Sequence, residues 1–450
     1  MNFEELKTWL LDNNITEIEC LVPDIAGIAR GKIMPAKKYL REESIRLPES
    51  LFGQTVTGDW PDDDVYDEII DPAEIDMHVL PDPDTVRFVP WAHEPTVQII
   101  HDCFYNDGSP VPMAPRNVLK RVLKLYADEG WKPVVAPELE FFLTEINNDP
   151  DYPLGPPTTG RSGRKETARK SYGIDAVNEF DPLFEEMYDY AETQRLAIDT
   201  LIHEDGAGQM EINFEHGDAL ELCDQVFVFK RTIREAAFHH KCTATFMAKP
   251  MANEPGSAMH VHQSVVSMET GRNIFTGSDG EPTDLFSWFI GGQQTYMNAA
   301  VPFFAPNVNS YRRLIPGMSA PINSHWARDN RTVGLRVPGS DGDNRRVEHR
   351  ISGADVNPYI AIAAMLATGY LGMKNKIQRT EEVVGSAHVL PHALPRTIEE
   401  GFRYLDNCQP LTEILGSRFV ALYKAVKMAE YVEFQQVISS WEREFLLLNV

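Results

Sequence analysis

Residues 331–350 read RTVGLRVPGSDGDNRRVEHR, and this stretch organises our interpretation of the rest of the chain. Two short strand-like runs flank a turn rich in Pro, Gly and Asp. In the second run Arg346, Glu348 and Arg350 fall at alternate positions, so on a strand their side chains share one face. Because arginine binds carboxylate and phosphate groups in a bidentate way, the pattern indicates a site for an anionic substrate or a metal. A solvated strand face is the alternative interpretation.

The composition is typical of a soluble enzyme with two domains. The chain has 450 residues, of which 43% are hydrophobic and 24% are charged, and its formal net charge is −25. Such an excess of negative charge argues against nucleic acid or an anionic membrane as a partner. An acidic surface would instead attract a cationic ligand, although acidic charge also simply keeps proteins soluble.

Cysteine usage and the lack of a membrane segment predict a cytoplasmic protein. The five cysteines are scattered along the chain and form no CxxC motif, which favours reduced thiols over a disulfide framework or a zinc site. The N-terminus is acidic and helical in pattern, without the basic flank of a signal peptide. The longest apolar run, residues 359–373, is too short to span a bilayer and predicts a buried helix capped by Asn357 and Pro358.

We expect two domains, a small β-rich one over residues 1–112 and a larger one over residues 113–450. The first begins with an amphipathic helix at residues 3–13 and a strand at residues 17–23. It also contains GDWPDDDVYD at residues 58–67, where five of ten residues are aspartate. Such a loop is usually only solvated, but it is also able to hold a polycation.

The larger domain carries acidic residues on predicted strands. On the strand predicted over residues 132–143, Glu138 and Glu140 point the same way. Two buried carboxylates on one face repel each other, so a cation must lie near them or one must be protonated. Further helices are predicted over residues 114–129, 181–196 and 227–242, and further strands over residues 243–249 and 256–265; Glu211 is expected to begin a strand.

Six residues are the candidate metal ligands: Glu138, Glu140, Glu204, Glu211, His260 and Glu348. Five carboxylates and one imidazole favour hard divalent ions, Mg²⁺ or Mn²⁺, over zinc or copper. A single histidine on a strand is more often a core residue. Five glutamates and a histidine that share strand parity are harder to explain as core residues. The sequence lacks a Walker A loop, a GxGxxG and an HExxH motif, so bound phosphate would be held by arginines and metal.

Ordered motifs along nearly the whole chain resemble those of the glutamine synthetase family. They are VAPELEFF (135–142), EDGAGQME (204–211), GSAMHVH (256–262), NVNSYRRLIPG (307–317), Asn330-Arg331 with LRVP (335–338), and RRVEHR (345–350). The resemblance implies an α+β fold, with a small N-terminal β-grasp-like domain and a catalytic domain in which a curved antiparallel sheet is flanked by helices. It also implies a homo-oligomer, a dodecamer of two hexameric rings, in which a neighbour's N-terminal domain completes each active site.

The resemblance also implies a role for each matching residue. ATP is the co-substrate, and two or more Mg²⁺ or Mn²⁺ ions serve each site, one held by Glu140, Glu204 and Glu211 and another by Glu138, His260 and Glu348. Glutamate would be bound by Arg313, Arg350 and Gly256. The catalytic residues would be Arg331, Arg336 and Glu204, with the two arginines on the transferring phosphoryl group. ATP would be contacted by His262, Ser264, Arg346 and Asp199.

The chain departs from the family pattern where ammonium is handled. Ammonium-using members carry a glutamate in a motif of the form RLxPGxEAP, but residues 313–321 read RLIPGMSAP, so Ser319 stands in its place. The N-terminal loop that supplies an aspartate to the same site reads LFGQTV at residues 51–56, with no equivalent aspartate. A small cation is poorly held without these carboxylates, and serine leaves room for a carbon-bearing amine.

We therefore expect ATP-dependent γ-glutamylation of a di- or polyamine such as putrescine, spermidine or spermine, through γ-glutamyl phosphate, as the first step of polyamine breakdown. Asp62 and Asp63, with their neighbours in the aspartate-rich loop, are the candidates for the distal ammonium. The alternatives are a ligase for a monoamine or ethanolamine, a divergent ammonium-using glutamine synthetase, and an inactive paralogue. Intact ligand and arginine positions argue against the last.

Overall fold

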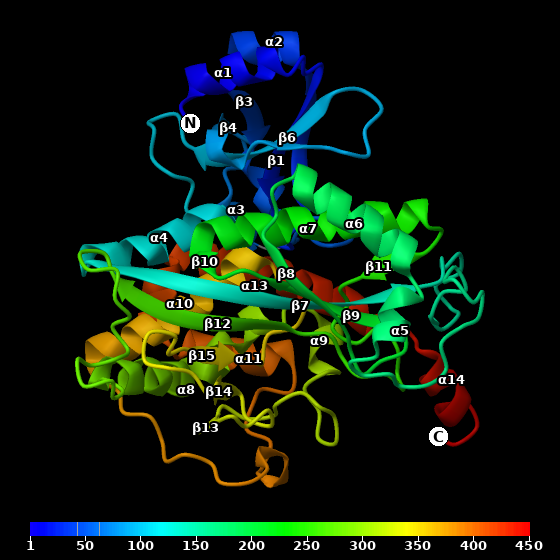
Figure 1. The fold of residues 1–450 in the computed structure, drawn as a ribbon, viewed down its shortest axis with the longest axis vertical. Helices are drawn as coiled ribbons and strands as arrows, with labels where there is room; N and C mark the ends of the chain where they lie inside the picture. The colour runs from blue at the N-terminus through cyan, green and yellow to red at the C-terminus, as the bar shows by residue number, and fades with distance from the viewer. Residues whose placement is uncertain (43, 63) are drawn as a thin grey trace.

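The computed structural model describes residues 1–42, 44–62 and 64–450, and these form two β-sheets with helices packed against them (Figure 1). All strands of the first sheet lie before residue 105 and all strands of the second lie after residue 130. The boundary predicted between residues 112 and 113 falls between the two groups.

The N-terminal part is built around the strand order β2-β1-β6-β4-β3, with β5 beside β6. β1 pairs antiparallel with β2 and parallel with β6, and β6 pairs antiparallel with β4. The elements are α1 (Phe3–Asp12), β1 (Glu17–Pro23), β2 (Ala29–Pro35), α2 (Ala36–Glu42), β3 (Ile45–Pro48), α3 (Asp64–Ile69), β4 (Asp76–Pro81), β5 (Arg87–Phe88) and β6 (Thr96–Phe104).

The second sheet has the strand order β13-β14-β15-β12-β7-β9-β8, and β10 and β11 each pair with β7. Its pairings are antiparallel, as predicted, except that β13 runs parallel to β14. The strands are β7 (Trp131–Thr144), β8 (Ile198–His203), β9 (Gln209–Phe214), β10 (Gly217–Asp218), β11 (Thr243–Thr245), β12 (Met259–Ser267), β13 (Trp326–Arg328), β14 (Leu335–Val337) and β15 (Val347–His349).

The central strand β7 separates an apolar face from an acidic one. Leu139 and Phe141 are fully buried, and the Phe141 ring lies 6.4 Å from that of Phe229 on α7. Glu138 and Glu140 alternate with them and therefore point to the opposite face. In Figure 1, α4 (Pro115–Asp128) and α7 (Ala219–His239) lie along the upper side of β7, between this sheet and the N-terminal part.

The apolar run predicted as a buried helix is α10 (Pro358–Asn375), and the Asn357 side chain caps it by accepting from the N–H groups of Tyr359 and Ile360. It packs against α8, α4, α7 and α12, which explains its apolar composition on all sides. The remaining helices are α5 (Ile174–Asn178), α6 (Asp181–Thr193), α8 (Asp284–Phe304), α9 (Val308–Tyr311), α11 (Ile398–Asp406), α12 (Gln409–Leu415), α13 (Ser417–Gln435) and α14 (Ser440–Leu446).

Several predicted boundaries were wrong. The helix expected from residue 227 begins at Ala219, because Asp218 accepts from the N–H groups of Leu220 and Glu221 and so caps it. The strand expected over residues 243–249 ends at Thr245, where its pairing with β7 stops. Glu211 lies inside β9 and does not begin it.

Among the described residues, no helix has both the length and the apolar character needed to cross a membrane.

Candidate active site

Strand register brings the predicted acidic residues together on one face of the second sheet. Glu140 is the direct partner of Glu211 across β7 and β9, and Glu138 is the partner of His260 across β7 and β12. Glu348 on β15 is paired with His262 on β12 and with Arg336 on β14. We call five of these residues the acid cluster: Glu138, Glu140, Glu211, His260 and Glu348.

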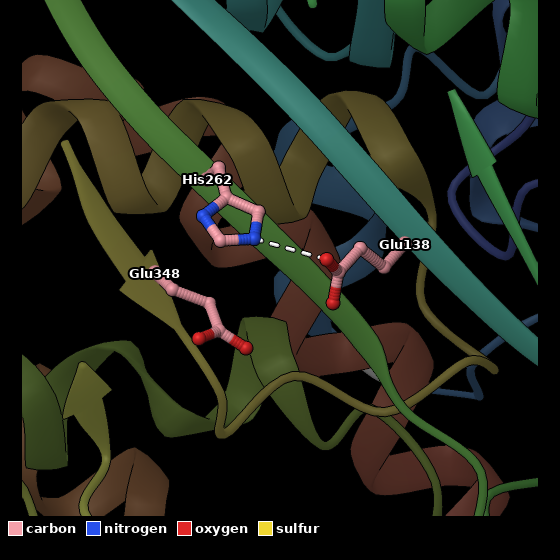
Figure 2. Close-up of side chains that lie close together, drawn as sticks. All are labelled: Glu138, His262 and Glu348. Atoms are coloured by element: carbon pink, nitrogen blue, oxygen red, sulfur yellow. Dashed lines mark hydrogen bonds and ion pairs between the residues drawn. The ribbon is translucent and has the colours of Figure 1, made fainter. Parts of the chain in front are cut away.

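Figure 2 shows Glu138, His262 and Glu348 pointing toward one another from three neighbouring strands. His262 Nε2 lies 3.0 Å from Glu138 Oε1. The His260 ring is central, because its Nδ1 lies 3.6 Å from Glu138 Oε2 and 3.8 Å from Glu348 Oε1. Carboxylate oxygens and imidazole nitrogens therefore converge on a small volume.

Cations and neutral donors hold the outer oxygens of the acid cluster. Arg336 Nη1 donates to Glu348 Oε2 at 2.9 Å, and Arg350 donates to the other Glu348 oxygen. Glu140 Oε2 accepts from the Ala258 N–H at 2.8 Å and from Gln209 Nε2 at 3.2 Å. Both Glu348 oxygens therefore have an arginine donor, whereas Glu140 Oε1 is left to face His260, whose Nδ1 lies 4.0 Å away.

The charges in the acid cluster do not balance without an added cation. Burial, followed by repulsion from Glu138 and Glu140, raises the pKa of Glu211 to about 10. Burial, followed by the Glu204 carboxylate, raises the pKa of Glu140 to about 8. Burial also acts on Glu138, but hydrogen bonds from His260 and His262 outweigh it and hold its pKa below the usual range. Two carboxylic acids forced to keep their protons near neutral pH indicate a site built for a divalent ion.

The donor geometry also fits metal binding. Two sets of three residues each place one ligand atom within 4.8 Å of the others: Glu138 with Glu211 and His260, and Glu138 with His262 and Glu348. The structure therefore groups the ligands differently from the sequence-based assignment. Glu138 belongs to both sets, His262 joins one of them, and neither set contains Glu140 or Glu204. Carboxylate-rich sets of this kind suit Mg²⁺ or Mn²⁺.

A cavity of about 380 Å³ opens beside the acid cluster. It is lined by the residues predicted to handle glutamate and phosphate and by the predicted amine-site serine: Arg313, Arg350, Gly256, Arg331, Arg336, Glu204 and Ser319. Arg313 is buried and donates to the carbonyl oxygens of Ile351 and Arg350, which fixes its direction. Gly256 lies so close to Arg313 that a Cβ added at Gly256 would be 2.6 Å from Arg313 Cγ, which leaves no room for another residue type.

A second cavity of about 670 Å³ adjoins the first, and all four residues predicted to contact ATP line it: Asp199, His262, Ser264 and Arg346. Glu138 and Asn213 line both cavities, so the two adjoin at the acid cluster. The buried Asn213 Oδ1 has no hydrogen-bond partner among the described residues. The arrangement suits a large phosphorylated ligand on one side, a small anionic one on the other, and metal between them.

The sequence did not single out several residues that line the first cavity. Tyr172, Asp205, Gln209, Asn213 and His388 all do so. Asp205 and Gln209 lie inside the EDGAGQME motif, so the sequence could have predicted that they lie near Glu204. Tyr172 and His388 reach the cavity from loops that are distant in sequence.

The structure does not place Asp62, a predicted amine-site residue of the N-terminal part, at the cavity within one chain. Asp62 is exposed and lines neither cavity, and Asp63 lies outside the described residues. Their role at the amine site stays a prediction.

Comparison with known proteins shows the family to which the chain belongs. Residues 112–446 match the family model described as glutamine synthetase, catalytic domain. The chain is 34% identical over 444 residues to gamma-glutamylputrescine synthetase PuuA of Escherichia coli (strain K12), covering 97% of this chain and 92% of that protein. It is 30% identical to glutamate–isopropylamine ligase of a Pseudomonas species, covering 97% and 96% of the two chains. A solved structure of ligand-free GmaS matches with a TM-score of 0.83 and 26% identity, covering 98% of this chain and 99% of that one.

The chain belongs to the glutamine synthetase family. The predicted α+β fold and the predicted class, an ATP-dependent glutamate–amine ligase, are both confirmed at the level of the family.

Proposed function

We propose that this enzyme joins the γ-carboxyl group of glutamate to a di- or polyamine, with putrescine as the representative substrate. The observation that carries the proposal is Ser319, which lines the first cavity at the position where ammonium-using members carry a glutamate. The similarity to gamma-glutamylputrescine synthetase supports the same substrate class. Because the product is a modified amine, the reaction suits the opening step of polyamine breakdown.

The reaction has two steps. A γ-carboxylate oxygen of glutamate attacks the γ-phosphorus of ATP, which releases ADP and forms γ-glutamyl phosphate. The amine nitrogen then attacks the γ-carbon, phosphate leaves, and the nitrogen loses a proton. Mg²⁺ or Mn²⁺ held by the acid cluster would neutralise the phosphate charges. Arg313 and Arg350 hold the glutamate, and Arg331 and Arg336 face the transferring phosphoryl group.

The amine must lose its proton before it attacks. A primary alkylammonium with a pKa near ~10.4 is only about one part in 10³ neutral at pH 7. Glu204 lines the same cavity as Ser319, and we assign it the role of accepting that proton. This assignment predicts a rate that rises toward alkaline pH.

The family resemblance and the buried cysteines support proposals for assembly and location. We infer a dodecamer of two hexameric rings and a cytoplasmic location, where ATP and glutamate are abundant. All five cysteines are buried and unpaired, which suits a reducing compartment. Size-exclusion chromatography with light scattering tests the assembly, and a mass close to one 50.9 kDa chain would contradict it.

The deciding experiment measures ADP release with glutamate, ATP and Mg²⁺ while the amine is varied. We expect strong rates with putrescine, spermidine and spermine, and weak rates with ammonium, ethylamine and ethanolamine. Mass spectrometry should identify the γ-glutamyl product. Ammonium rates that match the diamine rates would contradict the proposal and identify a divergent glutamine synthetase.

A monoamine ligase is the second candidate. Relatives include the glutamate–isopropylamine ligase and gamma-glutamylethanolamide synthetase GlnA4 of Streptomyces coelicolor (strain ATCC BAA-471 / A3(2) / M145), 30% identical over 449 residues. Ethylamine or ethanolamine rates that exceed those of every diamine would favour it.

A further inference from the structure

Ser319 lines the first cavity together with Tyr172 and Asp205, two residues that the metal, phosphate and glutamate roles leave unused. They come from the loop before α5 and from the turn between β8 and β9. We call these three residues the amine entrance.

Several contacts fix the loop before α5 to the β8–β9 turn. Glu166 Oε2 accepts from the Gly208 N–H at 2.6 Å and lies 3.0 Å from His203 Nε2. The Tyr172 N–H donates to the His203 carbonyl oxygen at 2.9 Å. Because Glu166 and Tyr172 are both bonded to the segment that carries Glu204, Tyr172 has a defined place at the cavity.

The Asp205 carboxylate keeps one oxygen available. Ser171 Oγ donates to Asp205 Oδ1. Within the described part of the chain, Asp205 Oδ2 has no hydrogen-bond partner, and no lysine or arginine forms an ion pair with either oxygen. A carboxylate oriented by a hydroxyl and left without a cation at a substrate cavity is suited to bind a cation from solution.

The Tyr172 backbone adopts a conformation that is uncommon for its residue type. Its φ is 59°, in the left-handed region, and its side chain is 66% exposed although it lines the cavity. Non-glycine residues in this region cluster at functional sites, where the surrounding structure imposes the conformation. The Tyr172 N–H is held by the His203 carbonyl oxygen, and the aromatic residue at the cavity is able to face an ammonium group.

We propose that Asp205 and Tyr172 bind the distal ammonium of the diamine and thereby set the preference for diamines over monoamines. The proposal rests on the proposed function and names residues for it within the same chain. The four carbons would pass the apolar wall formed by Ile202, Pro255 and Ala320.

Length and position agree with this assignment. Five bonds of about 1.5 Å place the two nitrogens of extended putrescine roughly 6 Å apart. Glu204 and Asp205 both line the first cavity. A diamine with one nitrogen near Glu204 therefore has a second ammonium available to Asp205, whereas ammonium and monoamines leave Asp205 without a cation.

The test compares putrescine with butylamine, which has the same four carbons and no second ammonium. We expect the wild-type enzyme to favour putrescine in kcat/KM. In Asp205→Asn the putrescine-to-butylamine ratio should fall by at least about tenfold, mainly through the KM for putrescine. Tyr172→Leu should lower the same ratio by about threefold, the size of an exposed cation–π contact.

Asp175→Asn is the matched control, because it removes the same charge from an exposed residue of α5 that does not line the cavity. The half-saturating Mn²⁺ concentration is measured for each variant. If kcat/KM falls equally for both amines in Asp205→Asn, the assignment is overturned and Asp205 has a structural role. If a shift in the Mn²⁺ requirement explains the fall, the assignment is overturned and Asp205 has a role in metal binding.

The outcomes separate the two proposals. A wild-type enzyme that favours ammonium or butylamine overturns the proposed function together with the subsite. A wild-type enzyme that favours putrescine, with an Asp205→Asn variant that keeps the preference, overturns only the subsite.

Discussion

The acid cluster and the amine entrance lie on the same cavity but are built in different ways. The acid cluster lies on four paired strands, where each side chain is fixed by a cross-strand partner. The amine entrance lies on three connecting segments, at Tyr172, Asp205 and Ser319. Phosphoryl transfer needs charges at fixed distances, which a sheet provides. Recognition of one amine among many is more readily changed on loops, where substitutions disturb few neighbours.

Substitutions in the acid cluster should have larger effects on turnover than substitutions at the amine entrance.

Glu211→Gln should lower kcat by at least about 10²-fold with every amine, because a charge that the metal needs is lost. In the metal-free protein, the same change should raise the melting temperature at pH 8, since Glu211 must bind a proton on folding at that pH and glutamine does not. Steady-state kinetics and thermal unfolding measure the two effects. Glu269→Gln, at an exposed position after β12, is the control and should do neither. A loss limited to one amine would contradict the division.

Metal-free protein should lose stability as the pH rises from about 5 to about 9. The pKa of Glu211 is raised to about 10 and that of Glu140 to about 8, above the ~4.3 of an unfolded glutamate. Over this window the folded state holds more protons than the unfolded state, so the free energy of unfolding falls with pH.

Thermal unfolding at several pH values measures this slope, and Mg²⁺ or Mn²⁺ should reduce it while releasing protons on binding. Calorimetry in buffers of different ionisation enthalpy counts those protons. A metal-free melting temperature that rises across this range would contradict the charge imbalance in the acid cluster.

Ser319→Glu should raise kcat/KM for ammonium by about tenfold and lower it for putrescine by a similar factor, because a carboxylate there attracts a small cation and fills the space for carbon. The Mg²⁺ requirement should change little. Ser319→Gln has similar volume without the charge and should lower putrescine turnover without improving ammonium turnover. Improved ammonium use by both variants would show that charge is not the deciding factor.

The smallest effect is expected for the double variant Asp62→Ala with Asp63→Ala. Asp62 is exposed and distant in sequence from the cavity residues, and exposed charge pairs contribute little. The KM for putrescine should therefore change by less than about threefold. A rise of tenfold or more would place these aspartates in the amine site, which would then require a neighbouring chain.

Local pattern predicted the acid cluster and the strands that carry it. Strand faces with acidic or cationic side chains were predicted from three features of the sequence. These were the alternation around Glu138 and Glu140, the EDGAGQME and GSAMHVH motifs, and the pattern of residues 331–350. Helix ends were less accurate where a capping residue was overlooked, as with Asp218 before α7. The grouping of ligands was not predictable, because it depends on how the side chains of four neighbouring strands converge on Glu138.

The sequence by itself determined the family, and it predicted the acidic and cationic residues that meet at the first cavity and the importance of Ser319. These features are local, because strand parity and motif spacing follow from the backbone geometry of a few consecutive residues. Only the tertiary structure decided that Tyr172 and Asp205 lie at the same cavity as Ser319, and that Asp62 does not line it within one chain. Loops distant in sequence meet only through the packing of the elements that carry them, and no local pattern records that meeting.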